Sequence, residues 1–296
     1  MKNPDHGHIE VPGARLYHEA EGEGPALTLI HAGVAHLRMW DQQVHAWRER
    51  FRVIRYDTRG FGRTETDDVP YSNVEDLRLL LDALGVDRTH LLGMSRGGII
   101  ATDFALAYPN RVRSLTWVAG GIRGFDVDDP RLEAIWPEME RLEQERDWTG
   151  LVELETQVWT DGPGQPTDRV PAELRRQMVG WNMQNYLAEQ PASQVIQPPP
   201  AVDRLAEIAV PTLVVWGTLD ELGVPSAGEK LAAEVPGARR HVFDGVAHMV
   251  NLERPQEFNQ VVLDFLTEVE AAEDAKRSAK GDSTGDGSPR PTREFG

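Results

Sequence analysis

The sequence contains no cysteine among its 296 residues. This absence excludes disulfide bonds, a cysteine nucleophile and a zinc site built on thiolates. It also fits a protein of the reducing cytoplasm, which is the location that we expect.

Long hydrophobic runs and an excess of basic residues are absent too. No apolar stretch approaches the roughly 18 residues of a membrane-spanning helix, and the first residues lack the apolar segment of a signal peptide. The chain has 31 basic and 48 acidic residues, which gives a net charge of −17. We therefore expect no nucleic-acid partner and no membrane association. Hydrophobic residues still make up 40% of the chain, as is typical of a globular protein with a packed core.

Short apolar runs alternate with helical patterns along much of the chain. Two alternating stretches around Pro12-Gly13 predict a hairpin, and the strand, helix, strand order that follows predicts an α/β fold with a parallel sheet. The predicted strands are His8–Val11, Ala14–Glu19, Ala26–Ile30, Arg52–Tyr56, 90–94, Val112–Val118, Thr212–Trp216 and Arg240–Phe243. The predicted helices are 72–84, 98–107, Arg131–Arg146, Thr149–Trp159, Pro171–Leu187 and Pro255–Val269.

The alternation stops after residue 121, and helical patterns without a convincing strand continue to residue 207. We therefore predict a core of residues 1–121 and 208–270, into which residues 122–207 are inserted as a helical cap. The cap has 17 acidic and 8 basic residues, so it carries −9 of the net charge. Residues 271–296 have almost no apolar side chains, which predicts a disordered C-terminal tail.

Residues 93 to 97 read Gly93-Met94-Ser95-Arg96-Gly97, between a predicted strand and a predicted helix. A serine between two glycines at this junction is typical of a nucleophile elbow. The serine occupies a sharp turn that projects its hydroxyl from the sheet, and the glycines leave room where strand and helix crowd each other. The pattern alone also matches ordinary Gly-Ser turns, so its partners decide the interpretation.

Two later loops supply such partners. Asp220 follows the strand pattern Thr212–Trp216, and His248 follows the last predicted strand. A serine hydroxyl needs a base to take its proton, and that base needs an acid to orient it. Glu221 lies beside Asp220, and the alternative is that either acid is a solvated loop charge. We interpret His31 as a structural hydrogen-bonding residue and His36 as a surface histidine, with a position at the entrance of the site as the alternative for His36.

These features together resemble the α/β-hydrolase family. The resemblance spans residues 8 to about 268 apart from the cap, and it implies a mostly parallel sheet of about eight strands flanked by helices, with an inserted helical cap. The matching pieces are His31-Ala32-Gly33-Val34, Asp57-Thr58-Arg59-Gly60-Phe61-Gly62, the Gly93–Gly97 elbow, Pro211 through Asp220, Gly245-Val246-Ala247-His248 and Asn251-Leu252-Glu253-Arg254-Pro255.

The resemblance also implies roles for these residues. Ser95 would be the nucleophile, His248 the base and Asp220 its orienting acid, with no cofactor and no metal. The backbone N–H groups of Arg96 and Gly33 would form the oxyanion hole, with Val34 as the neighbouring alternative to Gly33. The family often has glycine at position 32, where this chain has alanine, so the geometry of the loop is in question.

A serine nucleophile in this family implies acyl transfer. We expect hydrolysis of a small or medium apolar carboxylic ester or lactone, because the cap is rich in aromatic residues and the segment Arg38-Met39-Trp40-Asp41 resembles enol-lactonases and methylesterases. Most of the cap's tryptophans should pack its helices against the core, while some face the cleft. The alternatives are a carbon–carbon bond hydrolase of ring-cleavage products, a cofactor-free perhydrolase or haloperoxidase, and a catalytically silent ligand-binding protein. The patterns leave the oligomeric state open.

Overall fold

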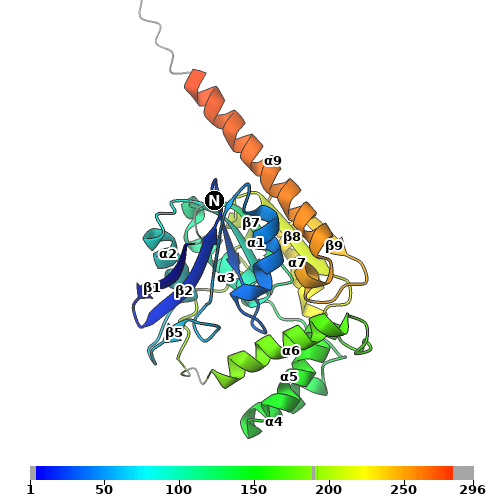
Figure 1. The fold of residues 1–296 in the computed structure, drawn as a ribbon. Helices are drawn as coiled ribbons and strands as arrows, with labels where there is room; N and C mark the ends of the chain where they lie inside the picture. The colour runs from blue at the N-terminus through cyan, green and yellow to red at the C-terminus, as the bar shows by residue number, and fades with distance from the viewer. Residues whose placement is uncertain (1–4, 189–190, 192, 283–296) are drawn as a thin grey trace, which may run out of the picture.

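One sheet forms the centre of the molecule (Figure 1). A computed structural model describes residues 5–188, 191 and 193–282, and in this part of the chain nine strands pair in the order β1-β2-β4-β3-β6-β7-β8-β9, with β5 paired to β2. Neighbours from β4 to β9 run parallel, whereas β2 is antiparallel to each of its three partners. The strands are β1 (Asp5–Val11), β2 (Ala14–Glu21), β3 (Ala26–Ile30), β4 (Arg52–Tyr56), β5 (Glu65–Thr66), β6 (Thr89–Met94), β7 (Val112–Val118), β8 (Thr212–Gly217) and β9 (Arg239–Phe243). The predicted mostly parallel sheet of about eight strands is confirmed.

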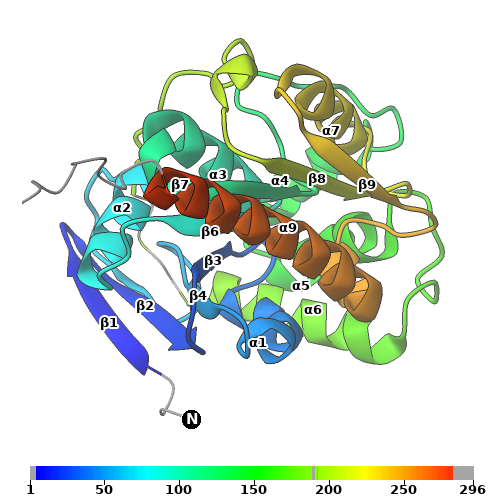
Figure 2. The ribbon, with the colours of Figure 1, turned by 90° about the horizontal axis from the view of Figure 1, so that it is seen from above.

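Helices cover both faces of this sheet (Figure 2). The helices α1 (Asp41–Trp47) and α9 (Pro255–Asp282) pack together on one face, and α2 (Asn73–Ala83), α3 (Arg96–Ala107) and α7 (Gly223–Glu234) cover the other. Every residue of β3, β6 and β8 is buried. Strands covered on both faces need continuous apolar runs, which is why short unbroken runs predicted them correctly. Among the described residues, no helix is long and apolar enough to cross a membrane.

Three further helices lie together beyond one edge of the strands (Figure 1). They are α4 (Ile135–Glu145), α5 (Trp148–Thr156), which continues into a π-helical segment (Gln157–Asp161), and α6 (Ala172–Leu187). The short helix α8 (Val250–Glu253) is not part of this group and lies between β9 and α9 in the chain. We call α4, α5, the π-helical segment and α6 the three-helix unit. It has a small apolar core of its own, formed by Leu132, Met139, Leu142, Leu151 and Val158. The three predicted helices of the segment 122–207 are therefore present.

The end of α9 corrects the predicted tail. The sequence patterns predict disorder from residue 271, but the helix continues to Asp282. Residues 271–278 are mainly Ala, Glu, Lys and Arg, which favour helix without apolar burial, and extending an existing helix needs no new nucleus. Glu273 adds an ion pair with Arg113 of β7 at 2.6 Å. The rest of the predicted tail, residues 283–296, lies outside the described residues.

The parallel register brings four loops to one edge of the sheet. Ile30 of β3 lies opposite Gly93 of β6, and Val118 of β7 lies between Met94 of β6 and Val215 of β8. The segments that follow these strands therefore meet at their carboxyl ends, which is where sites form in parallel sheets.

Candidate functional site

The turn at Ser95 has the strained geometry expected of a nucleophile elbow. Ser95 has φ 55° and ψ −119°, a combination that few residues other than glycine adopt. A Cβ at Gly93 would lie 2.0 Å from the carbonyl oxygen of Gly97, and a Cβ at Gly97 would lie 2.3 Å from that of Ile30. Both positions therefore require glycine, since strand and helix approach each other too closely for any side chain.

Asp220 and His248 form a buried pair. His248 Nδ1 lies 3.0 Å from Asp220 Oδ1 and 2.8 Å from Asp220 Oδ2, and both side chains are almost fully buried. The backbone N–H of Glu221 donates to Asp220 Oδ1 at 2.8 Å, and Arg131 donates to the Asp220 carbonyl oxygen at 2.9 Å. Asp220 is thus the acid that contacts His248. The neighbouring Glu221 instead accepts from the backbone N–H of Gly223, and burial raises its pKa.

Ser95 and His248 line the same cavity, which we call the Ser95 cavity. Its volume is about 470 Å³. No hydrogen bond among the described residues joins the Ser95 hydroxyl to the His248 ring; such contacts are often long without substrate. Much of the lining comes from the irregular segment that follows β7, with tryptophans from the three-helix unit. The lining residues are Ser95, Arg96, Ile99, Ala119, Gly120, Gly121, Phe125, Asp126, Val127, Asp128, Asp129, Trp136, Trp159, Glu221, Gly223, Val224, Ala227 and His248.

The two predicted oxyanion donors lie on adjoining segments. Arg96 is the first residue of α3, so its backbone N–H has no acceptor within the helix. A Cβ at Gly33 would be 3.8 Å from the Arg96 side chain, which packs beside the loop after β3. Ala32 does not occupy the left-handed region, so alanine there requires no strained backbone. The departure from glycine at position 32 is therefore tolerated.

A hydrogen-bond chain connects these two segments. Arg96 Nη1 donates to Thr58 Oγ1 at 2.6 Å, and the Thr58 backbone N–H donates to His31 Nε2 at 3.0 Å. His31 Nδ1 is 2.8 Å from the carbonyl oxygen of Ala32 and donates to it, because Nε2 is the acceptor. His31 is fully buried, and this burial lowers its pKa to about 3. His31 is therefore a neutral structural residue, as the sequence predicted.

Acid should destabilise the protein through His31. Below pH 6.5 the unfolded chain protonates this residue, whereas the folded chain does so only near pH 3, so stability falls as the pH drops between these values. From pH 7 to pH 5 the loss from this one group is about 2 kcal/mol. Urea unfolding of the parent and of His31→Gln, whose side chain does not titrate, measures it. We expect the parent to lose more stability than the variant, and equal losses would contradict the assignment.

The three-helix unit contacts the histidine loop directly. The ring of Trp159, in the π-helical segment, lies 4.8 Å from the His248 ring. Arg169 donates to the Thr160 carbonyl oxygen at 2.7 Å and forms an ion pair with Glu253 at 2.6 Å. Glu253 in turn accepts from the backbone N–H of Ala247 at 3.0 Å. Arg169 lies in the connection between the π-helical segment and α6, so its ion pair with Glu253 joins the three-helix unit to the loop that carries His248.

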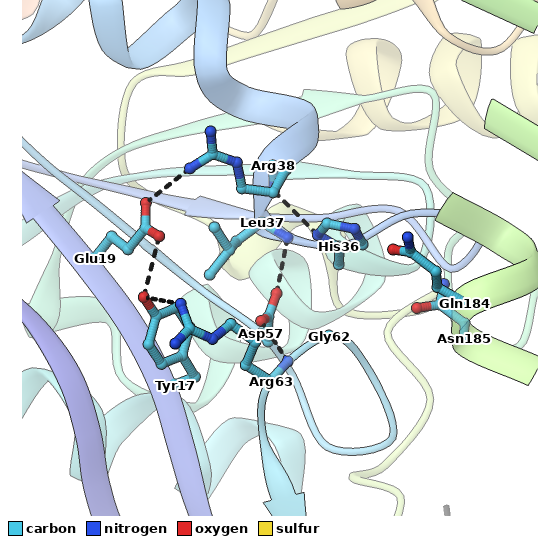
Figure 3. Close-up of a pocket in the computed structure, with 10 residues that line it drawn as sticks. All are labelled: Tyr17, Glu19, His36, Leu37, Arg38, Asp57, Gly62, Arg63, Gln184 and Asn185. Atoms are coloured by element: carbon cyan, nitrogen blue, oxygen red, sulfur yellow. Dashed lines mark hydrogen bonds and ion pairs between the residues drawn. The ribbon is translucent and has the colours of Figure 1, made fainter. Parts of the chain in front are cut away.

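A second cavity, of about 380 Å³, lies between the sheet and α6 (Figure 3). It contains none of the predicted site residues, but half-buried His36 lines it. Its polar groups bind one another: Arg63 donates to Tyr17 Oη at 2.6 Å, and the Glu19 carboxylate lies 3.6 Å from the Arg38 guanidinium. Burial raises the pKa of Asp57, another lining residue, to about 6. His36 therefore lies in a polar hollow, and the expectation of an open surface position is wrong.

Two of the tryptophans expected in the cap line the Ser95 cavity, and two do not. Trp136 and Trp159 line it, whereas Trp148 stacks on Tyr186 and Trp181 packs against a histidine outside it. The acidic residues of the segment after β7 also line it, and the sequence analysis did not single them out. Three Asp residues within 126–129 were the available signal in the sequence. No cluster of three or more His, Cys, Asp or Glu suited to a metal occurs among the described residues.

The family model of the alpha/beta hydrolase fold matches residues 25–255, which is most of the chain. This chain belongs to the α/β-hydrolase fold family. Its relatives include a protein of Azorhizobium caulinodans provisionally assigned as the carbamate hydrolase RutD, 34% identical over 87% of this chain and 97% of the relative. Another is 2-hydroxy-6-oxononadienedioate/2-hydroxy-6-oxononatrienedioate hydrolase 2 of Pseudomonas putida, 31% identical over 73% of this chain and 77% of the relative. The enol-lactonase of Burkholderia xenovorans LB400 superposes with a TM-score of 0.71 and 28% identity, covering 88% of this α/β-hydrolase and all of the enol-lactonase.

Proposed function

We propose that this α/β-hydrolase is a serine hydrolase that cleaves a small or medium apolar carboxylic ester or lactone through an acyl-enzyme. One observation carries the proposal: the buried Asp220–His248 pair and the strained Ser95 turn meet on one cavity. The pair leaves His248 Nε2 as the nitrogen for Ser95, because Nδ1 is engaged by Asp220.

In the proposed reaction, Ser95 Oγ attacks the substrate carbonyl carbon while His248 Nε2 takes its proton. The backbone N–H groups of Arg96 and Gly33 donate to the resulting oxyanion, an interaction worth about 3 kcal/mol per donor in related chemistry. His248 then gives the proton to the departing alcohol oxygen, and an acyl group remains on Ser95. A water molecule, deprotonated by His248, releases the acid and restores the enzyme.

Apolar surface in the Ser95 cavity supports an ester or lactone with an apolar portion. Ile99, Phe125 and Val224 line it together with the two tryptophans. An enol-lactonase is similar in fold over its whole length. In this proposal the three-helix unit acts as a cap, since it covers the carboxyl ends of the strands and its Trp159 contacts His248.

The second candidate is carbon–carbon bond hydrolysis of a ring-cleavage product. It is favoured by the 31% identity to the Pseudomonas putida hydrolase, whose name gives dienedioates as its substrates. The proposed catalytic residues would serve either reaction, so the substrate must be found by assay.

A substrate panel tests the proposal. Purified protein is assayed with short 4-nitrophenyl esters, aliphatic lactones and a ring-cleavage dienone acid, and Ser95 is probed with a fluorophosphonate. We expect ester or lactone turnover and labelling of Ser95 that an ester substrate competes away. Turnover of the dienone acid alone would support the second candidate, and failure of both turnover and labelling would contradict catalysis by Ser95.

A further inference from the structure

The Ser95 cavity has an unbalanced charge. Four carboxylates line it, from Asp126, Asp128, Asp129 and Glu221. Arg96 is the one Arg or Lys among the lining residues described. The segment after β7 supplies three of the four acids, so this wall of the cavity is negative.

Arg131 pairs with one of the four carboxylates, whereas the Arg96 side chain is directed to groups outside the cavity. Arg131 pairs with Asp129 at 2.5 Å, and this contact lowers the pKa of Asp129 to about 2. Arg96 directs its guanidinium to Thr58 and to Asn73, which do not line the cavity. In the described part of the chain, no Arg or Lys forms an ion pair with the other three lining carboxylates.

Aromatic rings accompany these carboxylates. The Trp159 ring lies 4.8 Å from the His248 ring, and the Trp136 ring lies 6.0 Å from that of Trp159. Trp136 is 40% exposed, so the aromatic surface extends from the histidine to the outside. Carboxylates alone are ordinary surface groups. Indole rings and carboxylates that line one cavity are a combination that can bind ammonium groups, since a cation is attracted both by the ring quadrupole and by the negative charge.

We propose that this cavity selects esters whose alcohol portion carries a positive charge, such as a quaternary or protonated amine. This inference rests on the proposed serine-hydrolase function. The alcohol portion is the part concerned, because His248 gives its proton to the leaving oxygen and Trp159 packs against His248. An ammonium group on that portion would lie in the same cavity as the indole rings, the acidic wall with Asp126 and Asp128, and Glu221. A dicarboxylate would meet the same wall with the wrong sign of charge.

Two isosteric esters test the charge preference. In butyrylcholine the alcohol ends in a trimethylammonium group, and in 3,3-dimethylbutyl butyrate a carbon atom replaces the nitrogen. We expect kcat/KM about tenfold or more higher for the choline ester at low ionic strength, and a smaller ratio at about 0.5 M salt, where exposed charges are screened.

Paired variants locate the effect. In Asp126→Asn/Asp128→Asn the ratio of the two kcat/KM values should fall toward one. The control Glu133→Gln/Glu140→Gln removes the same charge from exposed positions that do not line the cavity, and it should retain the parent ratio. A parent ratio near one, or an unchanged ratio in the Asp126→Asn/Asp128→Asn variant, would overturn this inference while leaving the serine-hydrolase proposal intact. Failure to hydrolyse either ester or any ester or lactone of the panel, without labelling of Ser95, would overturn both.

Discussion

Ser95→Ala is expected to lower kcat for ester hydrolysis by about 10⁴-fold or more, since removing a serine nucleophile abolishes the acyl-enzyme route. Residual turnover would come from the cavity and the oxyanion donors alone. The measurement is the steady-state hydrolysis of 4-nitrophenyl butyrate, or of the best substrate found in the panel.

The control for this variant is folding. Alanine retains the Cβ of Ser95, so the strained turn with φ 55° is unchanged and the thermal unfolding midpoint should stay close to that of the parent. A Ser95→Ala protein with parental activity would mean that another group performs the chemistry. A loss of activity together with a loss of folded protein would point to the turn rather than to the hydroxyl, and circular dichroism separates the two.

Asp220→Asn is expected to lower kcat by about 10⁴-fold at neutral pH. The backbone N–H of Glu221 donates to Asp220 Oδ1, so the asparagine oxygen should take that position and its NH₂ group should face His248 Nδ1. His248 would then accept at Nδ1 and carry its proton on Nε2. This is the wrong tautomer to take a proton from Ser95.

Glu221→Gln is the matched control for the orienting acid. Glu221 is adjacent in sequence and carries the same charge, but its carboxylate accepts from Gly223 and does not contact His248. With the uncharged ester 4-nitrophenyl butyrate as substrate, we expect a loss in kcat of less than about tenfold, in contrast to Asp220→Asn. If Glu221→Gln caused the larger loss, the assignment of Asp220 as the orienting acid would be wrong.

The central strands and the elbow could be predicted because local sequence determines them. Arg52–Tyr56 and Val112–Val118 are strands with the predicted bounds. The elbow needs its two glycines because a Cβ at either position would lie less than 3 Å from backbone atoms. The pairing of Asp220 with His248 followed from chain order and from the geometry of parallel strands. Such features depend on few residues that are close in sequence.

Other helices could not be read from their own residues. Helix α7 begins with Gly223 and contains Pro225 and Gly228, which are poor helix formers. The proline lies in the first turn, where it is tolerated, and a Cβ at Gly228 would lie 2.6 Å from the Trp216 ring. Tertiary contact with β8 therefore overrides local propensity. The same holds for α1, whose buried Gln43 bonds to Asn259 of α9 at 2.8 Å.

The lining of the Ser95 cavity was the least predictable part of the site. Asp126 and Trp136 come from a segment without regular structure and from a separate helix, and only the packed chain brings them to the same space as Ser95. The acidic composition of residues 122–207 was visible in the sequence. Its concentration on one wall of the cavity was not.

The Arg169–Glu253 ion pair limits how substrate can enter. Both side chains are mostly buried, at 13% and 7% exposure, and removing one partner of such a pair leaves the other charge without compensation. Arg169 also donates to the carbonyl oxygen of Thr160 in the π-helical segment, so lifting that segment would break one of these contacts and would move Trp159 away from His248. The side of the Ser95 cavity formed by Trp159 is therefore held in place by these contacts. We therefore expect large substrates to enter and leave beside the exposed Trp136 of α4, so turnover of large esters should depend on this ring more than on α5 or α6.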